Sequence, residues 1–172
     1  MYPLTQDKLK QIIIYNAETG VFTWRAVSGR RGGIRAGDVA GWLDSDTGYW
    51  KISIGNKNHL AHRLAWLYMT GIWPEQQIDH CDLNRANNIW TNLRLSTQTL
   101  NNANTGKRAD NTSGFKGVSR SRDRCWWAQI SKAGKHHNLG YFSTREAAAQ
   151  AYDRAALELF GDFARTNGLV PE

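Results

Sequence analysis

Apolar and polar residues in this chain change over at short intervals, and only a few stretches show helical spacing. Short apolar runs bounded by turn residues predict strands at VFTWR, DVAGWLD and GYWKISI, and further strands at FKGVSRSR, WWAQISK and HHNLGYF. The turn GNKN suits a hairpin after the third run. Helices are predicted over Leu4–Tyr15, over LAWLYMTG and over STREAAAQAYDRAALELFG. Several short strands with few helices predict an α+β fold.

The last predicted helix has the clearest boundaries. Ser143 suits the N-cap, Glu146 three residues later would complete a capping box, and Gly161 marks the end. Two neighbouring stripes rich in alanine would let this helix pack closely on a sheet. We therefore expect the C-terminal part to be a three-stranded antiparallel sheet packed on one helix.

The stretch IDHCDLNRANNIWTNLRLSTQTLNN holds six of the thirteen asparagines of the chain, next to an Asp-His pair. IDH and NLRL are predicted as two strands joined by a loop, and Ser96 as the cap of a helix over TQTLNNAN. Such a ββα unit could gather Asp79, His80, Asn92 and Asn101 around one point.

Those four residue types suit metal-assisted hydrolysis of a phosphodiester. Asp and Asn offer oxygen ligands for Mg²⁺ or Mn²⁺, a neutral imidazole can take a proton from water, and an Asn can orient that imidazole. Neighbouring strand residues point to opposite faces, so Asp79 and His80 share a site only if the strand ends or bends between them. The alternative is that the pair is surface polarity and the asparagines only make turns.

The charge of the chain indicates a polyanionic partner. The formal net charge is +7 and the pI is near 9.6, and residues 105–140 carry eight Lys or Arg against two Asp. No apolar run approaches the ~18 residues of a membrane span, and the N-terminus lacks the layout of a signal peptide. We expect a cytoplasmic protein that is not secreted. Cys81 and Cys125 form no CxxC and are expected to be reduced thiols.

Residues 58–104 resemble the HNH nuclease motif of phage homing endonucleases of the intron-encoded I-HmuI type. The matching positions are His62-Arg63, Pro74, Ile78-Asp79-His80, Asn84, Asn87-Asn88, Asn92-Leu93-Arg94 and Asn101. The resemblance implies that Asp79 and Asn101 bind one divalent cation, Mg²⁺ or Mn²⁺, that His80 is the general base and that Asn92 orients His80. Four-cysteine zinc knuckles are absent from the sequence, so no structural zinc is implied. The resemblance also implies a phage-infected host cell or a prophage carrier as the setting.

Residues 113–172 contain a second resemblance, to the plant ethylene-response-factor DNA-binding domain. The match lies at Gly117-Val118, Trp127-Ala128, Ile130, Leu139-Gly140, Phe142, Glu146-Ala147-Ala148, Ala151-Tyr152-Asp153, Ala155-Ala156, Gly161 and Asn167. The resemblance implies that the sheet enters the major groove of double-stranded DNA. Where many members have arginines after GV, this chain has Ser119 and Ser121. The candidate DNA contacts are Lys116, Arg120, Arg122, Arg124, Trp126, Gln129 and Lys132.

The predicted organisation has four parts. Residues 1–57 form a β-rich N-terminal region similar to one that precedes the HNH core in related phage proteins, and Arg30, Arg31 and Arg35 are candidate DNA contacts there. Residues 58–104 form the ββα-metal nuclease core, 105–112 a linker, and 113–172 the DNA-binding domain.

The expected function is that of a metal-dependent DNA endonuclease. With one candidate cluster per chain, we expect a monomer that nicks one strand. Two other classes stay open at this point. One is a DNA-binding protein of the transcription-factor kind that does not cut, and the other is an RNA-binding protein that stacks bases on Trp126 and Trp127.

Overall fold

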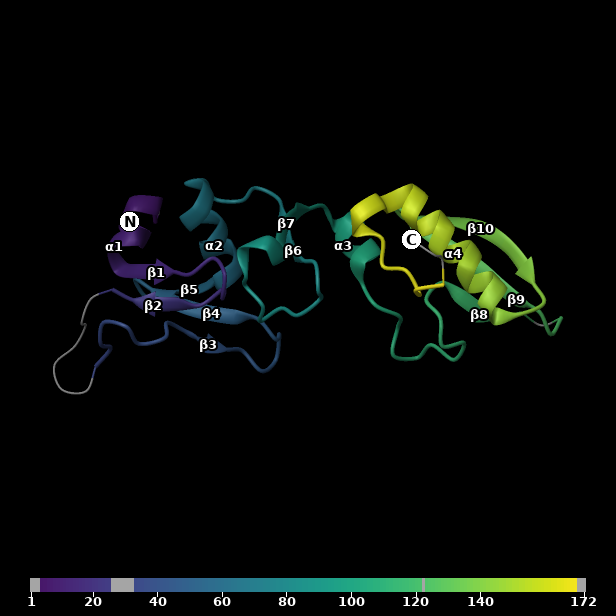
Figure 1. Ribbon diagram of the computed structural model, residues 1–172, viewed down its shortest axis with the longest axis horizontal. Helices are drawn as coiled ribbons and strands as arrows, with labels where there is room; N and C mark the ends of the chain where they lie inside the picture. The colour runs from purple at the N-terminus through teal and green to yellow at the C-terminus, as the bar shows by residue number, and fades with distance from the viewer. Residues whose placement is uncertain (1–3, 26–32, 122, 170–172) are drawn as a thin grey trace. The chain divides into compact units, whose positions relative to one another are not determined.

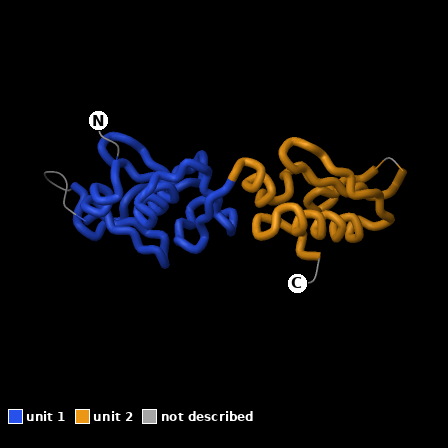
Figure 2. Tube along the Cα trace, turned by 90° about the horizontal axis from the view of Figure 1, so that it is seen from above, with its two compact units in different colours: residues 1–96 blue, residues 97–172 orange. Residues whose placement is uncertain are grey.

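The computed structural model describes residues 4–25, 33–121 and 123–169, and it confirms the α+β class (Figure 1). The chain divides into two compact units, Met1–Ser96 and Thr97–Glu172 (Figure 2). The boundaries expected at 57/58 and 104/105 are thus replaced by one division at 96/97. No helix of the described residues has the length and apolar character needed to span a membrane.

The described residues of unit 1 form three small antiparallel sheets, two α-helices and one 3₁₀ turn. Its elements are α1 (Gln6–Ile12), β1 (Ile13–Tyr15), β2 (Phe22–Trp24), β3 (Trp42–Leu43), β4 (Trp50–Ile54), β5 (Lys57–Leu60), α2 (Ala61–Thr70), β6 (Gln77–His80), the 3₁₀ turn η1 (Trp90–Asn92) and β7 (Leu93–Ser96). The sheets are β1-β2, β3-β4-β5 and β6-β7. The predicted hairpin turn joins β4 to β5, where Gly55 and Asn56 both have positive φ, as a tight hairpin requires.

The first helix is shorter than predicted. We expected it over Leu4–Tyr15, but it ends at Ile12 and the chain continues as strand β1. Within β1 Ile13 and Tyr15 are buried and Ile14 is exposed, which is the alternation of a strand. A run of β-branched isoleucines favours that change, because such side chains fit a pleated strand better than a helix.

One apolar core runs through the whole of unit 1. Fully buried residues come from the N-terminal region, such as Leu9, Phe22 and Ile52, and from the later segment, such as Leu64. The N-terminal region and most of the predicted nuclease core therefore fold together.

Unit 2 contains the predicted three-stranded sheet and its helix. The elements are α3 (Gln98–Asn104), β8 (Val118–Arg120), β9 (Trp126–Lys132), β10 (Lys135–Phe142), α4 (Arg145–Phe160) and the 3₁₀ turn η2 (Gly161–Phe163). The antiparallel strand order is β10-β9-β8, and α4 lies along one face of this sheet (Figure 1). Residues 105–112, predicted as a linker, contain no helix or strand.

Both helix caps in unit 2 differ from the predicted ones by one residue. Thr144 instead of Ser143 caps α4, accepting a bond from the backbone of Ala147, so Glu146 is one position too early for a capping box. Thr97 instead of Ser96 caps α3. In each case a serine and a threonine stand side by side, and either hydroxyl can cap the first turn of a helix. The choice between them, and so the start of the helix, is set by the packing of the rest of the unit.

A buried carboxylate ties the C-terminal segment to the sheet. Asp153 on α4 is fully buried and accepts bonds from the backbone of Asn167 and Leu169 and from the Asn167 amide. Asn167 in turn bonds the backbone of Lys116 in both directions. Gly117 follows with φ +75°, and a Cβ there would lie 2.0 Å from the Tyr152 ring. The start of β8 is therefore fixed closely against α4.

Candidate active site and DNA-binding face

His80 is the last residue of β6, and its side chain faces the interior of unit 1. It is 4% exposed, and its ring lies edge-on to His62, with 5.1 Å between the ring centroids. The Tyr49 ring lies 5.1 Å from His62 and 6.1 Å from His80. The two buried histidines and the half-buried Tyr49 form an aromatic cluster, which we call the histidine cluster.

Burial sets the protonation of both histidines. It lowers the pKa of His80, and the nearby Asn88 side chain, Asp82 and Asp79 oppose that shift only in part. Burial lowers the pKa of His62 to about 3, and the neighbouring His80 contributes to the shift. His80 is therefore a neutral imidazole near pH 7, which is the form that can accept a proton.

Asp79 precedes His80 in the strand and is held by an arginine. It pairs across the hairpin with Arg94, whose Nε and Nη2 lie 3.0 and 2.8 Å from Asp79 Oδ2. The Asp79 side chain is 11% exposed. Strand β6 includes both residues, in regular register with Arg94 and Leu93, so the strand does not end between Asp79 and His80 as one site for both would require. The guanidinium limits the orientations open to the carboxylate.

Asn92 closes the loop that follows His80. Its Nδ2 donates to Asp82 Oδ1 at 3.0 Å and to the Asn87 carbonyl at 2.9 Å, and its Oδ1 accepts the Asp82 backbone N–H. We expected Asn92 to orient His80 directly. The structure instead gives its amide two partners in the loop, so its influence on the imidazole passes through residues 81–87.

The neighbouring asparagines also build this loop. Asn84 and Asn87 use their side-chain oxygens to cap backbone N–H groups of Ala86 and Ile89, and the Asn87 amide donates to Asp82. Such local bonds are a known role of asparagine in turns. Much of the crowding of amides in the sequence is thus explained by loop construction.

The N-terminal region supports the same loop from outside. Tyr15 donates its hydroxyl to the Asn88 carbonyl at 2.6 Å, and the Trp90 N–H donates to Ala17. A Cβ at Gly20 would lie 2.4 Å from the Asn88 backbone. The loop beside His80 is therefore held by residues about seventy positions away in sequence, such as Tyr15 and Asn88 with a separation of 73.

Arg85 is a residue of this region that sequence reasoning missed. Its guanidinium lies 5.0 Å from the centre of the Tyr49 ring, and Nη1 donates to the Thr47 carbonyl. Its charge also lowers the pKa of His80. Only its place inside the motif loop could have drawn attention to it.

The second predicted metal ligand, Asn101, belongs to the other unit. It lies on α3, half-buried, whereas Asp79 lies in unit 1. Carboxylate and amide oxygens are hard donors, so this pair suits Mg²⁺ or Mn²⁺ by its chemistry. Among the described residues, no group of three or more His, Cys, Asp or Glu side chains could hold a metal ion. Any further ligands would have to be backbone oxygens, amides, water or phosphate.

The sheet of unit 2 has one face covered by α4 and one open face. Ala128 and Ile130 are buried toward α4, so the alternate residues of β9 and their partners point the other way. The open face carries Ser119, Trp127, Gln129, Ser131, His136, Asn138 and Tyr141.

Aromatic and polar side chains on this open face contact one another. Trp127 stacks on Tyr141, which is 61% exposed, and donates its indole N–H to Asn138. Ser131 and His136 are hydrogen-bonded. Sequence reasoning named Trp127 only as a residue that could stack RNA bases and did not name Tyr141, although the alternation of Ala128 and Ile130 with Trp127 and Gln129 separates the two sides of β9.

The structure places the predicted DNA contacts of the sheet on both of its faces. Gln129 is on the open face, whereas Arg120 and Trp126 pair with each other in the opposite register, the guanidinium 6.0 Å from the Trp126 ring. Lys132 reaches the Leu159 carbonyl on α4. Alternation of side chains places these residues on the helix side of the sheet.

The remaining predicted contacts are placed as follows. Lys116 directs its ammonium to two backbone carbonyls of the 103–105 segment. Arg124 is exposed in the turn between β8 and β9, and Arg35 is exposed in a turn closed by Asp38. Arg30, Arg31 and Arg122 lie outside the described residues.

Comparison with known proteins identifies relatives of both parts. Residues 59–103 match the family model of HNH endonucleases. The chain is 39% identical over 128 residues to an uncharacterised HNH endonuclease of Acanthamoeba polyphaga mimivirus, across 73% of this chain and 66% of that protein. It is 38% identical over 106 residues to Protein 3.8 of Escherichia phage T7, across 60% of this chain and 87% of that protein.

Two further similarities are more limited. An ethylene-responsive transcription factor of Arabidopsis thaliana is 43% identical over 67 residues, which is 38% of this chain and 26% of that protein. Among solved structures, one of DNA binding and cleavage by the HNH homing endonuclease I-HmuI aligns over 86% of this chain and 84% of that one, with 21% identity and a TM-score of 0.39.

Proposed function

Because this chain belongs to the HNH endonuclease family, we propose that it hydrolyses phosphodiester bonds of double-stranded DNA in a reaction that needs one divalent cation. The observation that carries the proposal is His80, a buried imidazole kept neutral within the family-matched segment. The setting we propose, the cytoplasm of a phage-infected cell, rests on the phage relative.

His80 is proposed to take the proton of the attacking water. Its lowered pKa favours the unprotonated imidazole near pH 7, which is the form that accepts a proton. The rings of His62 and Tyr49 pack around the imidazole and restrict its rotation. A positioned base of this kind contributes about 10²- to 10⁴-fold in rate.

Asp79 and Asn101 are proposed as the protein ligands of the cation, Mg²⁺ or Mn²⁺, and no structural zinc is invoked. When bound, a cation of this kind neutralises charge that builds up on the scissile phosphate. Arg94 holds the Asp79 carboxylate in place through two bonds to one oxygen. Asn92 is proposed to act by stiffening the loop after His80, which keeps the end of β6 in one conformation.

The open face of the unit 2 sheet is proposed to bind the duplex. Its support is the stacked Trp127–Tyr141 pair, the amides of Gln129 and Asn138, and the excess of basic residues over positions 105–140. The likeness to a plant transcription factor points the same way. Aromatic and amide groups contact bases, while lysines and arginines at the sheet margins contact phosphates.

We propose that the protein acts as a monomer and nicks one strand, leaving a 5′-phosphate and a 3′-hydroxyl. The experiment is incubation of purified protein with supercoiled phage-derived DNA and Mg²⁺ or Mn²⁺, with EDTA as the control. Open circles that accumulate without linear product support the nicking monomer. Linear product formed in one binding event, or cleavage that survives EDTA, contradicts it. Tight binding with no cleavage in either metal would favour the second candidate, a DNA-binding protein of transcription-factor type.

A further inference from the structure

The helix that carries Asn101 is built into unit 2. Ala103 is buried in a cluster with Tyr152, Ala156 and Phe160 of α4, and Leu100 packs against the same cluster. Helix α3 also contacts η2. A seven-residue helix is too short to be stable alone, so its conformation depends on these contacts.

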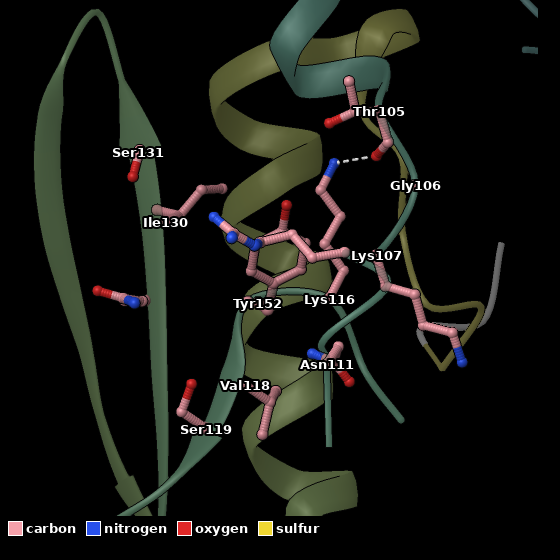
Figure 3. Close-up of a pocket in the computed structure, with 13 residues that line it drawn as sticks. Thr105, Gly106, Lys107, Asn111, Lys116, Val118, Ser119, Ile130, Ser131 and Tyr152 are labelled. Atoms are coloured by element: carbon pink, nitrogen blue, oxygen red, sulfur yellow. Dashed lines mark hydrogen bonds between the residues drawn. The ribbon is translucent and has the colours of Figure 1, made fainter. Parts of the chain in front are cut away.

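Lys116 holds the C-terminal end of α3. Its Nζ donates to the Ala103 carbonyl and to the Thr105 carbonyl, each at 2.6 Å. The bond to Thr105 is drawn in Figure 3. The last carbonyls of a helix have no partner within the helix and form the negative end of its dipole, so an ammonium is well suited to them. The Lys116 ammonium also lies 5.9 Å from the centre of the Tyr152 ring.

The backbone of Lys116 is itself immobilised. Asn167 accepts its N–H and donates to its carbonyl, and the buried Asp153 holds Asn167. The adjacent Gly117 sits against the Tyr152 ring. The ammonium is therefore presented from a turn just before β8 whose backbone is held by hydrogen bonds.

A cavity of about 270 Å³ lies next to this lysine (Figure 3). Its lining includes Thr105, Lys107, Gln129 and Tyr152, so the space between the segment after α3 and the sheet is not filled by apolar side chains. On this side the end of α3 is held by polar bonds of Lys116 in place of close packing.

We propose that Lys116 is a positioning residue for DNA cleavage. By binding the last carbonyls of α3 it fixes the direction in which Asn101, two residues before Ala103, presents its side chain. The inference rests on the proposed role of Asn101 as a metal ligand. It also gives Lys116 a different task from the phosphate contact expected from the sequence, because two of its three N–H groups point to backbone carbonyls.

The test compares variants of the full chain. Lys116→Met keeps the length and apolar contact of the side chain but cannot donate, whereas Lys116→Arg can still donate to both carbonyls. Lys135→Met is the matched control, because it removes the same charge from an exposed position on β10. Lys116→Gln replaces the Met variant should that variant fail to fold.

Three quantities are measured: hydrogen exchange of the amides of residues 101–104, duplex affinity at several salt concentrations, and the Mn²⁺ concentration that gives half-maximal cleavage. For Lys116→Met we expect the amides to exchange about tenfold faster or more through local opening of α3. The Mn²⁺ requirement should rise about tenfold, as for other residues that hold metal ligands. The duplex affinity of Lys116→Met should match that of the Lys135→Met control. Lys116→Arg should restore most of the slow amide exchange and most of the low Mn²⁺ requirement of the wild type.

The proposal would be overturned if the amides of residues 101–104 exchanged in Lys116→Met at the wild-type rate. A loss of affinity accompanied by a salt-dependence slope smaller by about 0.9 would also overturn it, because that is the signature of a lost phosphate contact. If the wild-type chain does not cut DNA at all, the proposed function and the positioning role both fail, and the exchange data alone then show whether Lys116 holds α3.

Discussion

The two histidines of the histidine cluster offer a paired test of the general base. His80 and His62 are 4% and 5% exposed, lie edge-on to each other and both approach Tyr49. Replacing either with alanine removes a similar buried ring from the same cluster. If packing were all that His80 contributes, the two variants would behave alike.

The magnitudes separate the two roles. Removing a large buried side chain costs about 2–5 kcal/mol of unfolding free energy. A typical domain has about 5–15 kcal/mol, so both variants should remain folded in the cold, with similar losses. Loss of a general base should slow cleavage by about 10²- to 10⁴-fold, so His80→Ala should fall in that range. His62→Ala acts only through packing, and we expect less than about tenfold, or 1.4 kcal/mol in barrier height.

The assay is single-turnover cleavage at saturating DNA and cation, with urea unfolding and duplex affinity measured on the same preparations. The expected outcome is equal affinity, similar stability loss and rates that differ by more than tenfold. Near-normal cutting by His80→Ala would refute the assignment of the base. Equal rate losses in the two variants would show that packing of the cluster, not proton transfer, limits the reaction.

Four further outcomes are expected. Because burial lowers the pKa of His80, the cleavage rate should stay level through neutral pH and fall only below its usual value of about 6.5, and a decline centred above pH 7 would contradict this. The pKa of His62 is about 3 in the folded state, so between about pH 3 and pH 6.5 the unfolded chain binds more protons than the folded chain. Lowering the pH from above 6.5 to 5 should therefore reduce the free energy of unfolding, measured by urea titration, by about 2 kcal/mol through His62 alone. In His62→Ala the reduction should be much smaller. Trp127→Ala should weaken duplex binding about tenfold, measured by fluorescence anisotropy, whereas Leu157→Ala on the exposed side of α4 should leave the affinity unchanged. Equal affinities of the two variants would exclude the open face as the duplex-binding surface. Gly117→Ala places a methyl group 2.0 Å from the Tyr152 ring, at a backbone φ of +75° that alanine rarely adopts. The variant should destabilise unit 2 by about 3 kcal/mol or more in thermal melts. An unchanged melting temperature would mean that β8 can shift to make room.

Local chemistry was enough to predict several elements. The Gly55-Asn56 turn is fixed by the positive φ that both residues tolerate, and strand β9 has the bounds expected from WWAQISK. The β6 strand and the β7 strand on either side of the asparagine loop were also predicted, with bounds that differ by one residue. In each case residues close in sequence decide the conformation.

Features that depend on distant residues were not predictable in this way. The end of α1 at Ile12 is decided by pairing of β1 with β2, and the division at 96/97 by packing of α3 on α4. Nothing within the segment TQTLNNAN itself tells which part of the chain its apolar residues will meet.

The candidate site shows the same limit. The motif predicted that the asparagines gather in one loop, but the burial of His80 became clear only from the structure, and the partner of Asn92 proved to be Asp82. The candidate DNA contacts were chosen by residue type and included residues of both faces of the sheet, whereas burial of Ala128 shows which face is open. Charged residues are poor guides to register because their long side chains are tolerated on either side of a sheet edge.

The loop at Asn88–Trp90 is supported by contacts with Tyr15, Ala17 and Gly20, which lie far earlier in the chain. These contacts affect the order in which the parts of the chain can fold during translation. Translation delivers the N-terminal segment first, and domains generally fold as units while the chain is still growing. When residues 81–92 are made, their supports are already present, so the loop beside His80 can order without waiting for the C-terminal unit. Asn101 is made later, as part of that second unit. On the proposed assignments, a ribosome-bound chain stopped near residue 96 would hold the proposed base, His80, but would lack the proposed ligand Asn101. Such a chain would therefore not be expected to cut DNA until unit 2 has followed.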